Sequence, residues 1–235
     1  MSHGNSTGRQ AIATCITLVA IAASFSCAAA DISVTVVDHD GRGVAEVVVF
    51  ATPAAASPAA ANPAGAKPGA APVLKPAVMD QRNREFVPRV LVVGVGTSVE
   101  FPNNDSVSHQ VYSFSAARRF QLPLYKGQPH PPVTFDKPGL VVLGCNIHDA
   151  MVGYVYVTDA PYFGITETAG GLTLKDLPAG DYRIVVWGPY IADAPASLVR
   201  TVHVDGSEPV IARFQLSLGL RARPEPRPRR RDWEY

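Results

Sequence analysis

Apolar and polar residues alternate over short runs through most of the chain, and no part of residues 80–157 keeps a helical period over three turns. Short strands with turns between them are typical of a β-sandwich or barrel. Residues 116–132 show no clear period and are predicted to be a long connection. The sequence therefore predicts an all-β fold. The runs that predict strands are 86–93, 97–101, 109–114, 132–135, 140–144 and 151–157.

Two further β-rich segments flank this central region. Residues 31–51 predict an N-terminal β-hairpin, because Ile32, Val34 and Val36 alternate with more polar neighbours ahead of turn-forming residues. Residues 160–220 predict a small β-rich extension with four strands. We expect this extension to form an additional small β-sheet unit, and pairing with the N-terminal hairpin is one arrangement open to it.

The remaining segments have compositions unlike those of strands. Residues 1–30 combine Arg9, an apolar run and three alanines at 28–30, which is the pattern of a signal peptide cleaved near Asp31. A retained anchor and a lipid-modified Cys27 are the alternatives. Residues 52–79 form an Ala/Pro-rich linker, and 221–235 form a basic, Pro-rich tail predicted to be disordered. The predicted organisation is therefore signal peptide 1–30, hairpin 31–51, linker 52–79, central domain 80–159, extension 160–220 and tail 221–235.

Composition and net charge bear on the core and on binding to nucleic acid. Apolar residues make up 47% of the 235 residues, which is enough for a core, and the net charge of +1 gives no global attraction to nucleic acid. The tail carries six arginines against three acids. Contact of this tail with an acidic partner or a membrane is possible but unsupported, because a solvated end accounts for the same composition.

Cleavage of the leader would leave a single cysteine. Cys15 and Cys27 would be removed, and Cys145 would remain. One cysteine cannot form an internal disulfide, and a free thiol in an oxidising compartment is a liability unless it is buried or bound to a metal. Cys145 therefore requires either a buried structural role or a ligand role.

Cys145, His148 and Met151 lie at intervals of three residues, with Gly144 before them and a predicted strand after them. Residues three apart on an extended strand point to opposite faces, so a tight loop must gather these side chains if they act together. A His₂Cys site with a weak axial Met is the type 1, or blue-copper, arrangement. Such a site needs a second histidine.

Four other histidines follow the leader. His39 lies in a predicted turn, His130 lies between two prolines in a loop, and His203 lies in the extension. His109 begins the predicted strand 109–114, directly after a polar loop, which suits a ligand position. The predicted metal ligands are His109, Cys145, His148 and Met151.

The stretch FPNNDSVSHQVYSF, followed by GLVVLGCNIHDAMVGYVYV, resembles the cupredoxins, the small blue-copper electron carriers. The nearest likeness is to amicyanin and to plastocyanin-like proteins associated with methylamine utilization. In that family an upstream His precedes a Cys-x-x-His-x-x-Met loop, as His109 precedes Cys145 here. The resemblance covers residues 80–157 and implies a Greek-key β-sandwich with copper at one end. Where the family usually carries Asn after the upstream His, Gln110 stands here, and Asn103 or Asn104 is the candidate to brace the Cys loop instead.

The flanking segments resemble carboxypeptidase-regulatory-like β-modules, a match that rests on the Leu-Pro-Ala-Gly turn at 177–180. This likeness implies a structural or adhesive extension and no reaction. Asn146 and Asp149 flank the predicted ligands and are candidates to fix the loop by hydrogen bonds.

These observations predict a periplasmic, monomeric type 1 copper protein that carries electrons to or from a redox partner, such as a cytochrome or a dehydrogenase, and is not an enzyme. Two alternatives remain open: a copper carrier or assembly protein, and a β-sandwich interaction module without metal. In the second, Cys145 and Met151 would fill a core. A cysteine-nucleophile enzyme is less supported, because no orienting third group accompanies Cys145 and His148.

Overall fold

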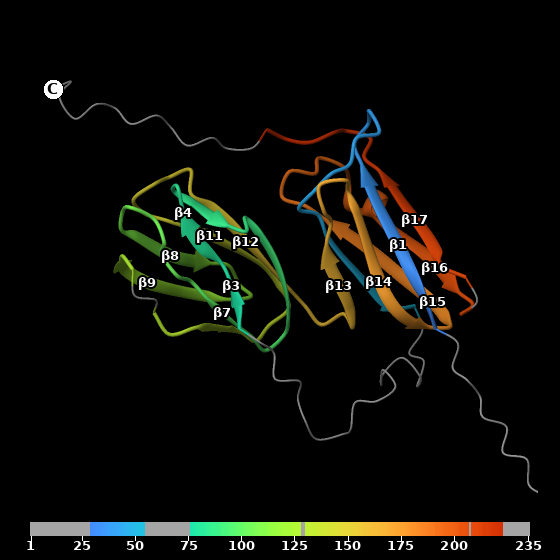
Figure 1. Cartoon of the computed structure of the whole chain (residues 1–235), viewed down its shortest axis with the longest axis horizontal. Coiled ribbons are helices and arrows are strands. Elements are labelled where there is room, and N and C mark those ends of the chain that lie inside the picture. Colours follow the sequence, from blue (N-terminus) through green and yellow to red (C-terminus); the bar gives the residue numbers. More distant parts are fainter. Residues whose placement is uncertain (1–28, 55–75, 128–129, 207, 223–235) are drawn as a thin grey trace, which may run out of the picture.

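The computed structural model describes residues 29–54, 76–127, 130–206 and 208–222, which fold into two β-domains (Figure 1). The described helical structure is one short 3₁₀ helix, η1 (Pro195–Leu198), so the predicted all-β class is confirmed. None of the described residues belongs to a helix long and apolar enough to cross a membrane. Most of the predicted signal peptide, linker and tail lies outside the described residues.

The central domain, residues 76–158, is a sandwich of short strands. A five-stranded sheet has the order β6-β12-β11-β8-β9, and a three-stranded sheet has the order β10-β7-β3, with a separate β4-β5 ladder. The strands are β3 (Ala77–Val78), β4 (Asp80–Arg82), β5 (Glu85–Val87), β6 (Val90–Gly94), β7 (Thr97–Glu100), β8 (His109–Phe114), β9 (Arg119–Tyr125), β10 (Val133–Phe135), β11 (Gly139–Gly144) and β12 (Val152–Thr158).

One apolar core lies between the sheets of the central domain. Val99 and Phe135 contribute to it from the smaller sheet, and Val111, Val141 and Val155 from the larger one. Each of these side chains is buried because strands place alternate residues on the same face. The two-sheet sandwich that the cupredoxin resemblance implied is therefore present.

Two predictions within the central domain were wrong in detail. The predicted strand 86–93 is interrupted at Pro88, and its halves become β5 and β6, which pair with β4 and β12. The predicted connection 116–132 contains β9, which pairs with β8. Pro123 obscured this strand in the sequence. The fold tolerates it because β9 is the edge of its sheet, where a missing N–H donor costs no ladder bond.

The flanking domain combines residues 29–54 with residues 160–220. Its sheets have the orders β14-β1-β17 and β13-β2-β15-β16. The strands are β1 (Ala29–Val37), β2 (Val48–Pro53), β13 (Tyr162–Ile165), β14 (Gly171–Pro178), β15 (Gly180–Trp187), β16 (Val199–Val204) and β17 (Val210–Gln215).

The predicted N-terminal hairpin was wrong as a pairing. The two strands exist, but β1 pairs with β14 and β17, whereas β2 pairs with β13 and β15 in the other sheet. Ile32 of β1 and Val49 of β2 instead lie in opposite sheets, and both pack in one core together with Ile184 and Phe214. Burying an apolar face against a second sheet satisfies both strands better than an exposed two-stranded hairpin, which is marginal in water.

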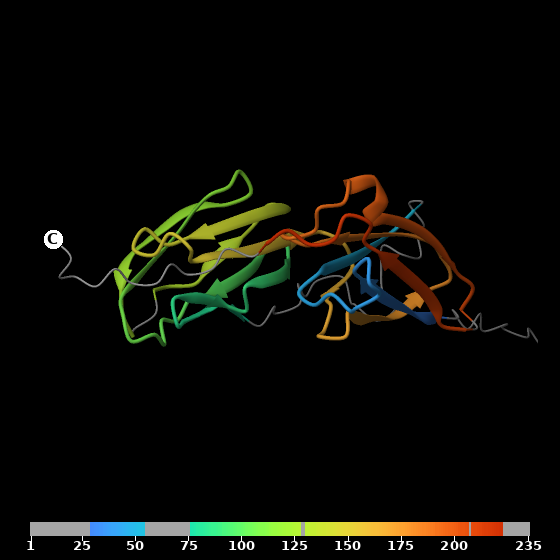
Figure 2. The ribbon, with the colours of Figure 1, turned by 90° about the horizontal axis from the view of Figure 1, so that it is seen from above.

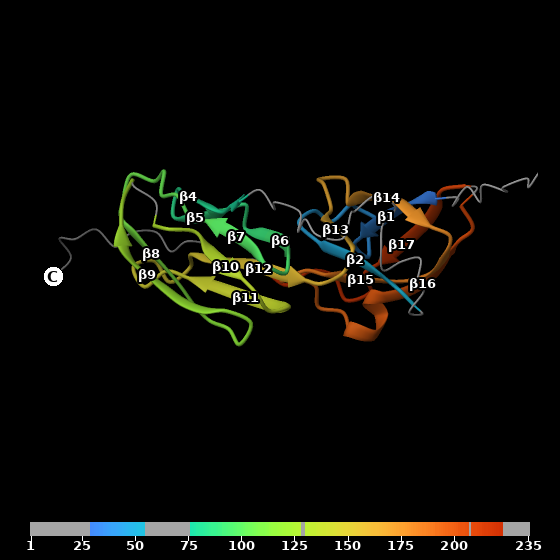
Figure 3. The same cartoon turned by 90° about the horizontal axis from the view of Figure 1, so that it is seen from below.

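The two domains lie end to end (Figures 2 and 3), and aromatic side chains of β12 and of the flanking domain are in contact. Trp187 contacts Tyr154 and Tyr156, with ring centroids 6.0 and 5.3 Å apart. Tyr190 packs edge-on to Tyr154, and its hydroxyl accepts a 3.2 Å hydrogen bond from the buried Arg89 guanidinium. These contacts leave the opposite end of the central sandwich uncovered by the flanking domain (Figure 1).

Candidate metal centre

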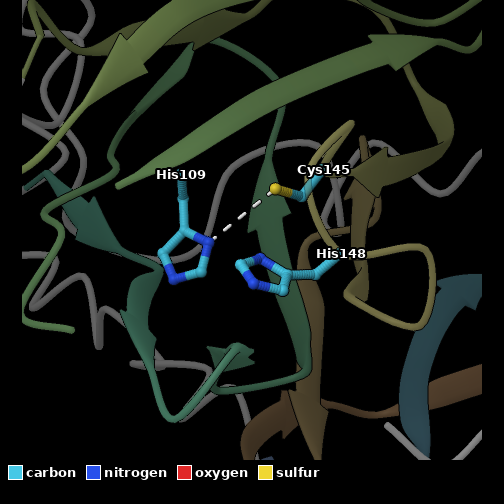
Figure 4. A group of neighbouring side chains, drawn as sticks. All are labelled: His109, Cys145 and His148. Carbon is cyan, nitrogen blue, oxygen red and sulfur yellow. Dashed lines mark hydrogen bonds between the residues drawn. The ribbon is translucent and has the colours of Figure 1, made fainter. Parts of the chain in front are cut away.

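Three predicted ligands meet at one end of the larger sheet of the central domain. His109 is the first residue of β8, while Cys145 and His148 lie in the loop between β11 and β12. Gly144, the last residue of β11, is paired with Tyr112 of β8, so the loop leaves the sheet beside the start of β8. Figure 4 shows the three side chains converging from the strand and the loop.

The geometry brings three donor atoms together, one each from His109, Cys145 and His148, all within 4.8 Å of one another. Nδ1 of His109 lies 3.8 Å from Sγ of Cys145. The two imidazole rings pack with centroids 5.0 Å apart at an angle of 60°. His109 and Cys145 are buried, whereas His148 is partly exposed, so this histidine forms the side of the site nearest solvent.

These distances fit a metal ion. Bonds of about 2.0 Å to nitrogen and about 2.3 Å to sulfur place the two ligand atoms about 3.5–3.7 Å apart at tetrahedral to trigonal angles. The 3.8 Å between Nδ1 of His109 and Sγ of Cys145 lies within about 0.1 Å of the upper end of that span, so only a small adjustment is needed. A thiolate with two imidazoles is a soft to borderline donor set, which suits copper.

Met151 lies at the end of the same loop. Its backbone N–H donates to the carbonyl of His148 at 2.8 Å, which closes a tight turn between these two residues. Its side chain is buried in the core cluster that also contains Cys145. The position is compatible with an axial thioether, and that role of Met151 stays a prediction.

The other histidines lie elsewhere. His39 and His203 belong to the flanking domain, where each is exposed and lies beside an aspartate. His130 packs edge-on to Tyr125 with centroids 4.7 Å apart and is outside the three-residue cluster. His109 is therefore the histidine that the fold brings to Cys145 and His148, as predicted.

The brace of the Cys loop differs from the prediction. Gln110 itself accepts a 2.6 Å hydrogen bond from the Asn146 side-chain amide, because its longer side chain reaches across to the loop. Asn103 instead donates to the carbonyls of Val107 and Tyr125. The expectation that Asn103 or Asn104 braces the Cys loop was therefore wrong, and Gln110 fills that position together with Asn146.

Asn104 has a different partner, Asp80 of β4. The Asp80 carboxylate accepts hydrogen bonds from both the backbone and the side chain of Asn104, at 3.3 and 2.9 Å. Burial alone would raise the pKa of Asp80, but hydrogen bonds from Asn104, Gln81 and Arg82 outweigh it and lower the pKa below its usual value. Asp80 thus anchors the loop 101–108 that leads into β8.

Asp105 is a neighbour of the candidate site that sequence reasoning missed. Its Oδ2 lies 2.8 Å from Nε2 of His109, on the side of the ring opposite Cys145. Burial would raise the pKa of Asp105, but hydrogen bonds from His109 and from the backbone of Arg84 and Ser106 hold it at about 2. The available signal was a carboxylate four residues before a ligand histidine, which is hard to distinguish from ordinary loop polarity.

Tyr125 is a neighbour of the site in the core cluster that also contains Cys145 and Met151. It is paired with His109 across β8 and β9, and its hydroxyl donates to the carbonyl of Phe101. Burial raises the pKa of Tyr125 to about 12. The phenol therefore stays neutral beside the site over the whole physiological pH range.

No family model and no curated protein gives a significant match to this chain. Among solved structures, a purple cupredoxin from Nitrosopumilus maritimus is 25% identical, covers 35% of this chain and 99% of its own, and has a TM-score of 0.32. An oxidised amicyanin variant is 24% identical over 35% of this chain and 82% of its own, with a TM-score of 0.33.

A copper-containing nitrite reductase from Thermus scotoductus is 31% identical, covers 43% of this chain and 26% of its own, and has a TM-score of 0.35.

Independently of these matches, the central domain has a cupredoxin-like arrangement. It is a two-sheet β-sandwich in which one His begins a strand, and Cys, His and Met lie in the loop before another strand. The cluster of His109, Cys145, His148 and Met151 is consistent with a type 1 copper site.

Proposed function

We propose that this protein carries electrons by means of one copper ion held by His109, Cys145 and His148, with Met151 as the axial ligand. The convergence of three donor atoms within 4.8 Å, in a partly buried site at the end of a rigid sandwich, is the observation that carries this proposal. Copper, when bound, supplies a one-electron redox couple.

The residues of the chain have distinct tasks in this proposal. His109 and Cys145, both buried, exclude water from the site and supply an imidazole and a thiolate. His148 is partly exposed, and it is therefore the ligand through which electrons are expected to enter or leave. Strands β8, β11 and β12 fix the ligand positions from one sheet, so the donor atoms move little between redox states.

The proposal extends to compartment and partners. The signal-like residues 1–30, together with the single cysteine that would follow their removal, support action in the periplasm. The protein would act as a monomer that meets a redox protein, such as a cytochrome or a dehydrogenase, in a small and transient contact. In this role it has no substrate of its own and is not an enzyme.

The test is voltammetry of the copper-loaded protein. We expect a reversible one-electron wave, and retention of copper against a modest chelator during repeated cycling. A copper carrier is the second candidate, because the partly exposed His148 would also allow metal exchange. Rapid loss of copper to the chelator, together with a poorly reversible wave, would contradict electron transfer and support copper delivery as the function.

A further inference from the structure

We propose that Asp105 is a positioning residue of the copper site, whose carboxylate holds His109 with Nδ1 toward Cys145 and lowers the reduction potential of the bound copper. This inference rests on the proposed function. It concerns a residue of this chain that neither the ligand pattern nor the sequence resemblance assigns.

The first step is the orientation of His109. A neutral imidazole carries one ring proton, and the hydrogen bond made by one nitrogen decides which nitrogen is left to bind metal. Asp105 Oδ2 lies 2.8 Å from Nε2, while Nδ1 faces the Cys145 thiol at 3.8 Å. The carboxylate therefore fixes the proton on Nε2 and leaves the lone pair of Nδ1 directed into the site.

The second step is the rigidity of Asp105 itself. Its carboxylate also accepts backbone N–H groups of Arg84 and Ser106, each at 2.6 Å. Its own backbone N–H donates to the side chain of Asn103 at 3.0 Å. The side chain is only 6% exposed, and it cannot turn away from His109 without losing the hydrogen bonds from Arg84 and Ser106.

The third step is the charge. Among the described residues, no lysine or arginine side chain forms an ion pair with the Asp105 carboxylate, so its charge is not neutralised by a neighbouring cation. A poorly exposed negative charge bonded to a ligand makes that imidazole a stronger donor. It favours the more highly charged Cu(II) over Cu(I), because opposite charges attract more strongly away from bulk water. The expected consequence is a lower reduction potential than the ligands alone would give.

The test compares Asp105→Asn with wild type, and Asp149→Asn is the matched control. Asn keeps an acceptor oxygen but removes the charge. Asp149 was a candidate to fix the loop, but it is exposed and its side chain makes no hydrogen bond among the described residues. Its replacement therefore removes the same charge while leaving the contact between Asp105 and His109 intact. We expect D105N to weaken Cu(II) binding about 10–100-fold with a smaller effect on Cu(I). Each tenfold difference between the two ions raises the potential by about 59 mV.

A measurement without metal separates this inference from the proposed function. In the copper-free wild type, ¹⁵N NMR of the imidazole should show His109 as the Nε2–H tautomer, with a slowly exchanging proton. An Nδ1–H tautomer in the wild type, or a D105N potential no different from that of D149N, would overturn the role of Asp105. If the wild type binds no copper, the proposed function and the effect on potential both fall, while the tautomer still decides whether Asp105 orients the ring.

Discussion

The side chains at the candidate copper site divide their hydrogen-bonding atoms between the site and the surrounding protein. His109 turns Nδ1 to Cys145 and Nε2 to Asp105. The next residue, Gln110, points to the opposite face of β8 and binds Asn146, which directly follows Cys145. One residue of β8, His109, therefore supplies a candidate ligand, and the next residue, Gln110, braces the loop that contains Cys145.

The brace predicts a measurable coupling between Gln110 and Asn146. Each single change to Ala should lower the free energy of unfolding of the metal-free protein by about 0.5–1 kcal/mol, because the bond lies near the surface. The double variant should lose little more than either single variant, since both remove the same bond. Urea unfolding of the four proteins measures this cycle, and strictly additive losses would show that the brace contributes nothing.

The candidate ligands and one residue that supports their loop, Asn146, were predictable from the sequence, whereas Asp105 was not. Cys145, His148 and Met151 stand at a spacing that is typical of a metal-binding loop, and His109 begins a strand that the alternation predicts. Asn146 was a candidate because it directly follows Cys145, and its hydrogen bond to Gln110 confirms it, whereas Asp105 resembles an ordinary loop residue in the sequence. Their roles depend on which backbone groups and rings lie within 3 Å of them, and only the folded chain decides that.

At the level of the elements, the Tyr112 side chain of β8 lies directly against Gly144 of β11. A Cβ placed on Gly144 would lie 2.7 Å from the ring of Tyr112, well inside van der Waals contact. Gly144 directly precedes Cys145 in the chain.

Gly144→Ala should therefore destabilise the domain by about 1–3 kcal/mol through overpacking. Adding Tyr112→Ala should recover part of that loss, because the smaller side chain vacates the space that the new methyl group needs. Thermal unfolding of the single and double variants tests this. A G144A protein as stable as wild type would mean that Tyr112 moves aside without cost.

The loop 101–108 predicts a pH dependence through its anchor, Asp80. The folded pKa of Asp80 lies below its ordinary value of 3.8, so the stabilisation is present above that value and is lost as pH falls through the folded pKa. Asp80→Asn should lose about 1–3 kcal/mol at pH 7, and the difference from wild type should shrink toward about pH 3. Urea unfolding at both pH values measures this, with D149N as the control. A difference that does not change with pH would contradict the anchoring role.

Strand positions were easier to predict than strand partners. The alternation of apolar and polar residues located β1 and β2. The same alternation is expected whether the two strands pair as a hairpin or lie in opposite sheets of a sandwich, as they do here. The choice depends on residues 160–220, which supply the neighbours of both strands and lie more than a hundred positions away. Pattern within a short window cannot report such long-range pairing.

For the whole molecule, the two domains meet through aromatic rings at the end of the central sandwich away from the His109 ligand. Trp187 contacts two tyrosines of β12, and Tyr190 contacts one of them as well as Arg89. None of these residues belongs to the ligand set. The flanking domain is therefore expected to support the central domain without altering the metal site.

Trp187→Ala should lower the stability of the protein by about 1–3 kcal/mol, because each aromatic pair contributes about 0.5–1.5 kcal/mol. It should also separate the unfolding of the two domains into two calorimetric transitions, while the visible spectrum of the copper-loaded protein stays the same. Tyr190→Phe, which removes only the bond from Arg89, is the milder control. A changed spectrum in W187A would show that the interface does reach the metal site.

The central claim is that Cys145 supplies a thiolate to copper, and a visible-light titration tests it most directly. Wild-type protein receives Cu(II) stepwise, with Cys145→Ala beside it. We predict an intense thiolate-to-copper absorption band that saturates at about one copper per chain in the wild type and is missing in C145A. A wild-type protein that stays colourless, or a C145A protein that keeps the band, would contradict the assignment of this loop as a type 1 copper site.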